Sequence, residues 1–292
     1  MDVTVRGPGP DAPFLGARDL FETERTLQRP VTVEVRENPD ERTRVSHDEA
    51  GHLFVISRQA ATSAMARELA LHEFAHMHHY EDGHPSHTQS MEEVIFLALA
   101  GRSVEQRKLT HCYQIANHMK DIYADDLWLE VAPADKLVAF LESSLAAAVA
   151  DRPRDRPAWG HAAERSQRRP GPAEHAAQRT PAADPDITAV NAAFALGLVE
   201  RHDLVGDDHR IYDLAYAAAQ DAPEVDMPEF TRRFRTLVRD PDDSEYRKAL
   251  VDVTRAFRYS LSSGFSASVR KCRVNDSSPI SGASAAAAWA RS

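Results

Sequence analysis

Cysteine and long apolar runs are scarce in this sequence. Only two of its 292 residues are cysteines, and Cys112 and Cys272 form no spaced pair, which argues against a disulfide framework. No stretch of about 18 uncharged apolar residues occurs, so no transmembrane span is expected. The start, Met-Asp-Val-Thr, has neither the basic nor the apolar region of an export signal. We therefore expect a cytoplasmic protein.

Lysine is also rare. Only five of the 35 basic residues are lysines, and 45 acidic residues give the chain a formal net charge of −10. Such an acidic, lysine-poor composition looks like that of proteins from halophilic archaea. Phosphate groups are bound by clustered Lys and Arg, so we expect neither a nucleic acid nor an anionic membrane as a partner. The composition does not predict the oligomeric state.

The most informative pattern is a single H-E-x-x-H at His72-Glu73-Phe74-Ala75-His76. No Gly or Pro falls between Gln59 and Asp82, so the motif is expected on one helix, where His72 and His76 project from the same face. Two imidazoles placed in this way can bind one zinc ion. Glu73 is then close enough to take a proton from a water that the zinc has acidified. The motif predicts a zinc hydrolase with one ion per chain.

Before the motif, apolar residues recur at every second position, as in strands, and from the motif onward they recur at the spacing of helices. Val31, Val33 and Val35 alternate with polar residues, and 52–57 is a second β-rich run, which together indicate two or three short strands. Helices are expected over four following ranges, namely Gln59–Tyr80, Ser90–Ala100, Ser103–Val131 and Ala134–Val149. The expected fold class is α+β, mostly α, with a small N-terminal sheet that leads into the motif helix.

Composition divides the chain into five parts. They are an irregular lead-in with one helix (1–30), a catalytic domain (31–150), a linker (151–186), a C-terminal helical lobe (187–258) and a disordered or atypical tail (259–292). The linker is rich in Pro and Arg and poor in aliphatic residues, so it is expected to be disordered. The tail lacks the acidic bias of the rest of the chain.

A catalytic zinc site needs a third protein ligand, and the expected helix Ser103–Val131 supplies the main candidates. On a helical wheel, a polar stripe with two carboxylates borders an apolar face, so its members must find buried partners. We expect Asp121 or Asp125 to bind zinc and the other to hold a histidine ligand by its second ring nitrogen. The stripe consists of His111, Gln114, His118, Asp121 and Asp125.

Other ligands are less favoured by their positions. Glu92 and Glu93 follow His76 by 16 and 17 residues, not far from a short thermolysin-like spacing, although the first turn of a helix also favours solvated carboxylates. Asp82 is a weaker candidate. The remaining histidines after the motif are expected on solvated faces or in the following loop; they are His78, His79, His84 and His87.

The segment Asp121–Asp125, D-I-Y-A-D, is similar to the E-x-x-A-D element of gluzincin metallopeptidases of the Ste24 and HtpX type. In that family the Glu is the third zinc ligand and the Asp one turn later supports the site. Asp121 stands here where the family has Glu, and the membrane spans of those peptidases are missing. More broadly, LALHEFAHMHHYEDGH and HCYQIANHMKDIYADD resemble an uncharacterised, zincin-like family of unknown function from haloarchaea. The resemblance covers most of residues 31–258 and implies a zincin-like fold and a metal, but no known substrate.

We therefore expect a soluble, zinc-dependent, metallopeptidase-like hydrolase in which metal-activated water attacks a peptide or amide carbonyl. Its expected substrate is a peptide or protein, by analogy only. The alternative is a non-catalytic, metal-binding regulatory or interaction protein on the same scaffold. Two histidines and a carboxylate also suit ferrous iron or manganese, so zinc is an inference from the motif.

Overall fold

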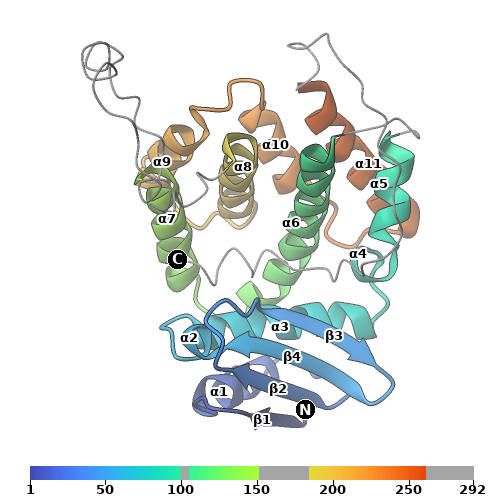
Figure 1. Cartoon of the computed structure of the whole chain (residues 1–292), viewed down its shortest axis with the longest axis vertical. Coiled ribbons are helices and arrows are strands. Elements are labelled where there is room, and N and C mark those ends of the chain that lie inside the picture. The colour runs from blue at the N-terminus through green and yellow to red at the C-terminus, as the bar shows by residue number, and fades with distance from the viewer. Residues whose placement is uncertain (100–104, 151–183, 261–292) are drawn as a thin grey trace, which may run out of the picture.

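The structure is a computed structural model that describes residues 1–99, 105–150 and 184–260. Figure 1 shows a small sheet at one end of the molecule and a set of helices above it, so the expected α+β, mostly α class is confirmed. In chain order the elements are β1 (Val3–Arg6), α1 (Ala12–Phe21), β2 (Val31–Arg36), β3 (Arg44–Asp48), β4 (Gly51–Ser57), α2 (Arg58–Ala61), α3 (Ala66–Glu81), α4 (Pro85–Thr88), α5 (Met91–Leu99), α6 (Gln106–Val131), α7 (Asp135–Ala150), α8 (Pro185–Arg201), α9 (Arg210–Ala219), α10 (Met227–Arg235) and α11 (Asp243–Ser260).

The four strands form one mixed sheet in the order β1-β2-β4-β3. β1, β2 and β4 run parallel, whereas β3 pairs antiparallel with β4 and forms one edge. The expected alternation in β2 is confirmed, because Val31, Val33 and Val35 are buried and their neighbours are only partly buried. Gly51 opens β4 with a positive φ of 146°, and a side chain there would collide with the carbonyl of Pro30.

The first thirty residues are more regular than expected. β1 adds a strand to the sheet, and α1 covers the sheet with two buried phenylalanines. Phe14 meets Phe54 of β4 edge to face at 5.8 Å, and Phe21 meets Phe74 of α3 at 6.1 Å between ring centroids. The lead-in therefore helps to clamp the motif helix onto the sheet.

The expected helix Gln59–Tyr80 is broken into α2 and α3. Thr62 and Ser63 turn their hydroxyls back onto carbonyls of the preceding turn, and so compete with the helical hydrogen bonds although neither Gly nor Pro is present. α3 then runs for 16 residues and ends before Gly83, whose φ of 69° reverses the chain. The motif therefore lies in the middle of α3.

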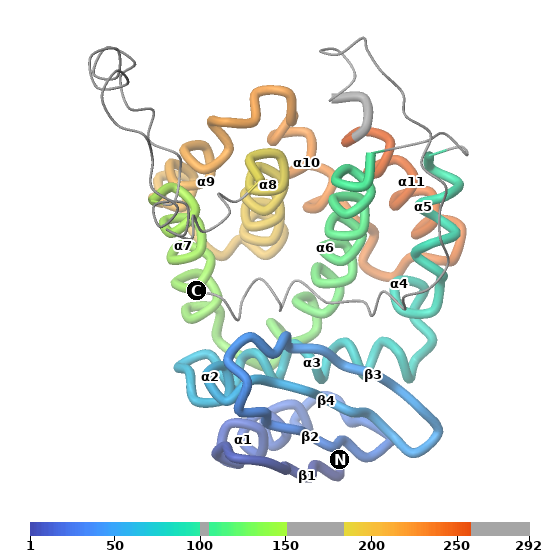
Figure 2. Tube along the Cα trace, viewed as in Figure 1, coloured from blue at the N-terminus to red at the C-terminus, as the bar shows by residue number. Residues whose placement is uncertain are grey.

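The other predicted helices α5, α6 and α7 are observed within a few residues of their expected bounds. The C-terminal lobe contributes α8 to α11, with α8 buried along most of its length against α9 and α10. α11 returns to pack beside α5 and α6, as Figure 2 shows. Segments distant in sequence thus enclose α6, the longest helix described.

Some expectations fall on residues that are not described. Residues 151–183 of the expected linker and 261–292 of the expected tail lie outside the described residues, whereas Pro185 already belongs to α8. Among the helices described, none combines the length and the apolar character needed to cross a membrane.

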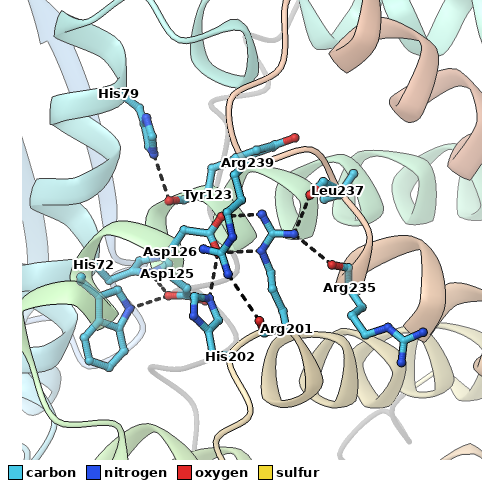
Figure 3. A network of polar contacts seen from close by, with 11 residues as sticks. His72, His79, Tyr123, Asp125, Asp126, Arg201, His202, Arg235, Leu237 and Arg239 are labelled. Carbon is cyan, nitrogen blue, oxygen red and sulfur yellow. Dashed lines mark hydrogen bonds and ion pairs between the residues drawn. The ribbon is translucent and has the colours of Figure 1, made fainter.

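A buried ion pair joins α6 to α8. The guanidinium of Arg201 donates two hydrogen bonds to Asp126, at 2.7 and 2.6 Å, and a third and fourth to the carbonyls of Arg235 and Leu237 (Figure 3). His202 Nε2 donates to the same carboxylate at 2.8 Å. Because the Arg201 side chain is only 3% exposed, its charge depends on Asp126 for compensation.

Replacing Asp126 with Asn should lower the free energy of unfolding by about 3 kcal/mol or more, because it leaves a buried guanidinium unpaired. Urea denaturation at neutral pH measures the change. The control is Glu130→Gln, which breaks the exposed pair of Glu130 with Arg25 and should change stability by less than about 1 kcal/mol. Equal effects of the two substitutions would show that the Asp126 pair does not stabilise the contact between the helices.

The difference in stability between the wild type and Asp126→Asn should also depend on pH. Burial raises the pKa of Asp126, but the hydrogen bonds from Arg201 and His202 outweigh it and leave the pKa below its ordinary value of 3.8. A carboxylate with a lowered pKa stabilises the folded state above its ordinary pKa and loses that contribution as the pH falls through the lowered one. The stability gap between the wild type and Asp126→Asn should therefore shrink on acidification below 3.8.

Candidate metal centre

Two helices bring three metal-binding side chains together. His72 and His76 lie one turn apart on α3, and Asp121 faces them from α6. The two Nε2 atoms are 3.0 Å apart, and Asp121 Oδ1 lies 3.7 Å from Nε2 of His72 and 3.3 Å from Nε2 of His76. These three atoms form one group close enough to hold a single metal ion.

The spacing and burial of this group fit a metal better than they fit ordinary hydrogen bonds. Ligands about 2.0–2.1 Å from a tetrahedral zinc are about 3.3 Å from one another, close to the three observed separations. Both carboxylate oxygens of Asp121 are buried, and neither accepts a hydrogen bond of ordinary geometry from the described residues. A buried carboxylate without such partners is costly unless a cation compensates it.

Asp125 lies on the opposite side of the His72 ring. His72 Nδ1 donates to Asp125 Oδ1 at 2.8 Å, and the indole Nε1 of Trp128 donates to the same oxygen at 2.6 Å; Figure 3 shows the contact with His72. This arrangement leaves Nε2 of His72 directed at Asp121 and His76. Of the two carboxylates left open by the sequence, Asp121 therefore lies where a third ligand could join the two histidines, and Asp125 lies where it orients the ring of His72.

His118 closes the other side of Asp121. Its Nδ1 lies 3.8 Å from Asp121 Oδ2, while its Nε2 donates to Asn191 Oδ1 of α8 at 2.8 Å. The ring stacks on Phe194 with 4.4 Å between centroids. The polar stripe predicted on α6 thus turns inward at His118, Asp121 and Asp125, all of them buried.

The electrostatics of the centre favour a positive charge. Burial raises the pKa of Asp121, but the neighbouring rings of His118, His72 and His76 outweigh it and hold the pKa well below its usual value. Burial lowers the pKa of His72, yet Asp125 and Asp121 raise it well above its ordinary value. The buried carboxylates therefore attract a cation to this point, which a proton or a metal ion can supply.

Glu73, the expected base, is 1% exposed and lies in the turn of α3 between the two histidines.

The alternative ligands lie elsewhere. Glu92 and Glu93 are exposed in the first turn of α5, and exposed Asp82 pairs with His78 at 3.1 Å. None of the three belongs to the group that could hold a metal ion.

A second group, His111 with Asp184 and Asp186, is also compact enough for a metal ion. Arg107 already pairs with both carboxylates, and its contact with Asp186 measures 2.9 Å. The guanidinium supplies the positive charge that a metal would bring, so we assign this group to packing between α6 and α8.

The expected places for the histidines that follow the motif were solvated faces or the following loop. His84 and His87 do follow α3, but neither they nor His79 are fully solvated. His79 is buried and donates from Nε2 to the carbonyl of Tyr123 at 2.9 Å, as Figure 3 shows, and His84 and His87 are partly buried. His87 Nε2 lies 2.7 Å from Nδ1 of His76. Sequence reasoning did not predict the contact of His87 with His76, because α4 is only four residues long and shows no period; the clustering of histidines was the one available signal.

Comparison with known proteins gives a family but no function. A family model described as "Family of unknown function (DUF5781)" matches residues 1–259. No curated protein and no solved structure matches the chain.

The two aspartates can be told apart by substitution. Asp121→Asn should weaken zinc binding by more than about 100-fold because it removes a ligand, whereas Asp125→Asn should weaken it about tenfold because it removes only a charged support. Competition with a chromogenic chelator measures both affinities. Glu92→Gln and Glu93→Gln are the matched controls and should bind zinc like the wild type. The reverse ranking of the two aspartates would make Asp125 the ligand.

Proposed function

Because the chain belongs to the DUF5781 family, whose function is unknown, we propose its function from the metal centre alone: a zinc-dependent, metallopeptidase-like hydrolase on a zincin-like scaffold. One observation carries the proposal. Nε2 of His72, Nε2 of His76 and Oδ1 of Asp121 converge within a buried site. Three protein ligands of this kind leave a fourth position open, which is the arrangement of catalytic rather than structural zinc sites.

Zinc is preferred over other metals because the motif on α3 supplies two imidazoles and a carboxylate together with an adjacent Glu. Two histidines and one carboxylate are also the ligands of many ferrous sites, so iron and manganese are the competing ions to test. When bound, the ion would acidify a water molecule and polarise the carbonyl under attack.

The chain's own residues would carry the proton transfers. Glu73 directly follows His72 on α3. Among the carboxylates that are not proposed as ligands or supports, it is the one closest in sequence to a ligand, so we propose it as the base. It would take the proton of the attacking water and return it to the leaving nitrogen. Asp125 keeps the proton on Nδ1 of His72, so that Nε2 stays free to bind the metal.

An extended peptide fits the surroundings as a substrate. β3 is an edge strand, and Figure 1 shows it on the side of the sheet that faces the helices. His47 of β3 stacks on Tyr80 of α3, with 4.0 Å between ring centroids, so this edge is attached to the motif helix. A free strand edge can bind an extended chain through its backbone groups.

The first test is metal content. Protein purified without a tag at high salt should contain about one zinc per chain by inductively coupled plasma mass spectrometry, and His76→Ala should lose it. His78→Ala is the control, because His78 lies on the same helix but pairs with Asp82 outside the centre. Absence of a stoichiometric metal from the wild type, even after reconstitution with zinc, iron or manganese, would refute the hydrolase proposal.

Turnover is tested with Glu73→Gln. The substitution should reduce the hydrolysis of a quenched fluorescent peptide library by at least about 100-fold, because general base catalysis contributes at least that much. Zinc affinity should stay within about threefold of the wild type, since Glu73 is not a ligand. If wild type and variant both bind zinc and neither cleaves peptides or amides, the chain is better explained as a non-catalytic metal-binding protein.

A further inference from the structure

The short helix α4 carries a chain of hydrogen bonds that begins at the metal centre. His76 Nδ1 and His87 Nε2 are 2.7 Å apart, and their rings are tilted by 50°. From His87 Nδ1 the chain passes to Ser86 Oγ at 2.7 Å, and from Ser86 Oγ to His84 Nδ1, also at 2.7 Å. Three such short contacts in sequence indicate a built arrangement rather than a chance approach of loop residues.

We propose that His87 is the positioning residue of His76: it accepts the Nδ1 proton of His76 and thereby directs Nε2 of His76 at the metal. This inference rests on the metal centre of the proposed function, and it adds a residue outside the H-E-x-x-H motif. It also assigns a role to Ser86 and His84, which fix the orientation of His87 in turn.

The tautomers of the three histidines give this chain of hydrogen bonds a direction. When Nε2 of His76 binds a metal, its Nδ1 must carry the proton and donate to His87 Nε2. His87 is then protonated at Nδ1 and donates to Ser86 Oγ, whose hydroxyl donates to His84 Nδ1. The far end of the chain favours the same direction, because His84 Nδ1 also accepts from the backbone N–H of Ser86 at 3.3 Å and so is an acceptor for the Ser86 hydroxyl.

The two histidine ligands are thus held by different chemistry. His72 has a carboxylate behind it, Asp125, whereas His76 has the imidazole of His87. The atom of His87 that can accept is Nε2, which lies 2.7 Å from Nδ1 of His76. A second supporting carboxylate would add a charge to a buried region that already holds Asp121 and Asp125, so a neutral acceptor is the less costly support.

α4 is held in place from α6 and α11, which makes the position of His87 well defined. The His87 ring stacks on His79 at 5.2 Å, and His79 is attached to the Tyr123 carbonyl of α6. Ser86 is fully buried. Gln89, which follows α4, donates to the carbonyl of Asp243 at the start of α11. The support of His76 therefore comes from residues that follow the motif helix rather than from α3 itself.

The experiment compares His87→Leu with His87→Gln. Leu fills the space without accepting a hydrogen bond, and the amide oxygen of Gln can lie near the position of Nε2 and accept. Zinc affinity, measured by chelator competition, should fall about 10- to 100-fold in His87→Leu and recover to within about threefold of the wild type in His87→Gln. His78→Ala serves as the control and should not change the affinity.

Nitrogen chemical shifts of the histidine rings supply a second readout that a purely structural role would not change. In the zinc-loaded wild type, ¹⁵N spectra should show the proton of His76 on Nδ1, of His87 on Nδ1 and of His84 on Nε2. In His87→Leu, with its fold verified by circular dichroism, the His76 resonances should broaden or shift.

Each outcome decides between the proposals. A wild type that binds no metal refutes the metal centre and the role of His87 together. A wild type that binds zinc, with His87→Leu equal to it in affinity and in the His76 shifts, overturns the role of His87 alone. Equal losses in His87→Leu and His87→Gln would show that His87 acts through packing and not as an acceptor, which also overturns the proposal.

Discussion

The burial of negative charge between α3 and α6 is the constraint on which the rest of the structure depends. Asp121 and Asp125 are almost inaccessible to water, and beside them lie two imidazoles whose Nε2 atoms approach within 3.0 Å. Burying such charges without compensation would cost several kcal/mol for each ion. The arrangement calls for a positive charge, which a proton on a histidine or a metal ion at the three converging donor atoms can supply. The two helices therefore pack around a point of negative potential.

Each donor of the centre is supported by a different residue, two of them on α6 and one on α4. Asp125, with Trp128, holds His72 from α6. His87 holds His76 from α4. His118 reaches Asp121 and is itself hydrogen-bonded to Asn191 of α8, which attaches the third donor to the C-terminal lobe. The H-E-x-x-H helix supplies the two imidazoles, but the geometry of the centre depends on elements that lie up to about 120 residues later in the sequence.

How much of this the sequence predicts follows from the range of the forces involved. The local pattern of apolar residues gave the mostly helical class and most helix positions, because burial of one face sets that period. The pattern did not predict β1, because a strand of four residues is too short to show a period. It also did not predict the break between α2 and α3, which depends on the hydroxyls of Thr62 and Ser63. The third ligand stayed open between Asp121 and Asp125 because one helical turn separates them, and only the packing of α3 against α6 distinguishes the two. The contact of His87 with His76 was not predicted for the same reason, since it is set by the path of the chain into α4.

The neighbouring residues Asp125 and Asp126 show why α6 is the central element. Asp125 turns toward α3 and orients a ligand, while Asp126 turns away and binds Arg201 of α8 in a buried, bidentate pair (Figure 3). One helical step thus connects the support of the metal centre with the contact that fixes the C-terminal lobe. A change that shifts α6 along its axis would disturb both contacts at once, because the two carboxylates are on consecutive residues of the same helix. The contact that fixes the lobe and the contact that orients His72 therefore share one helix, which also holds Asp121 opposite His72 and His76.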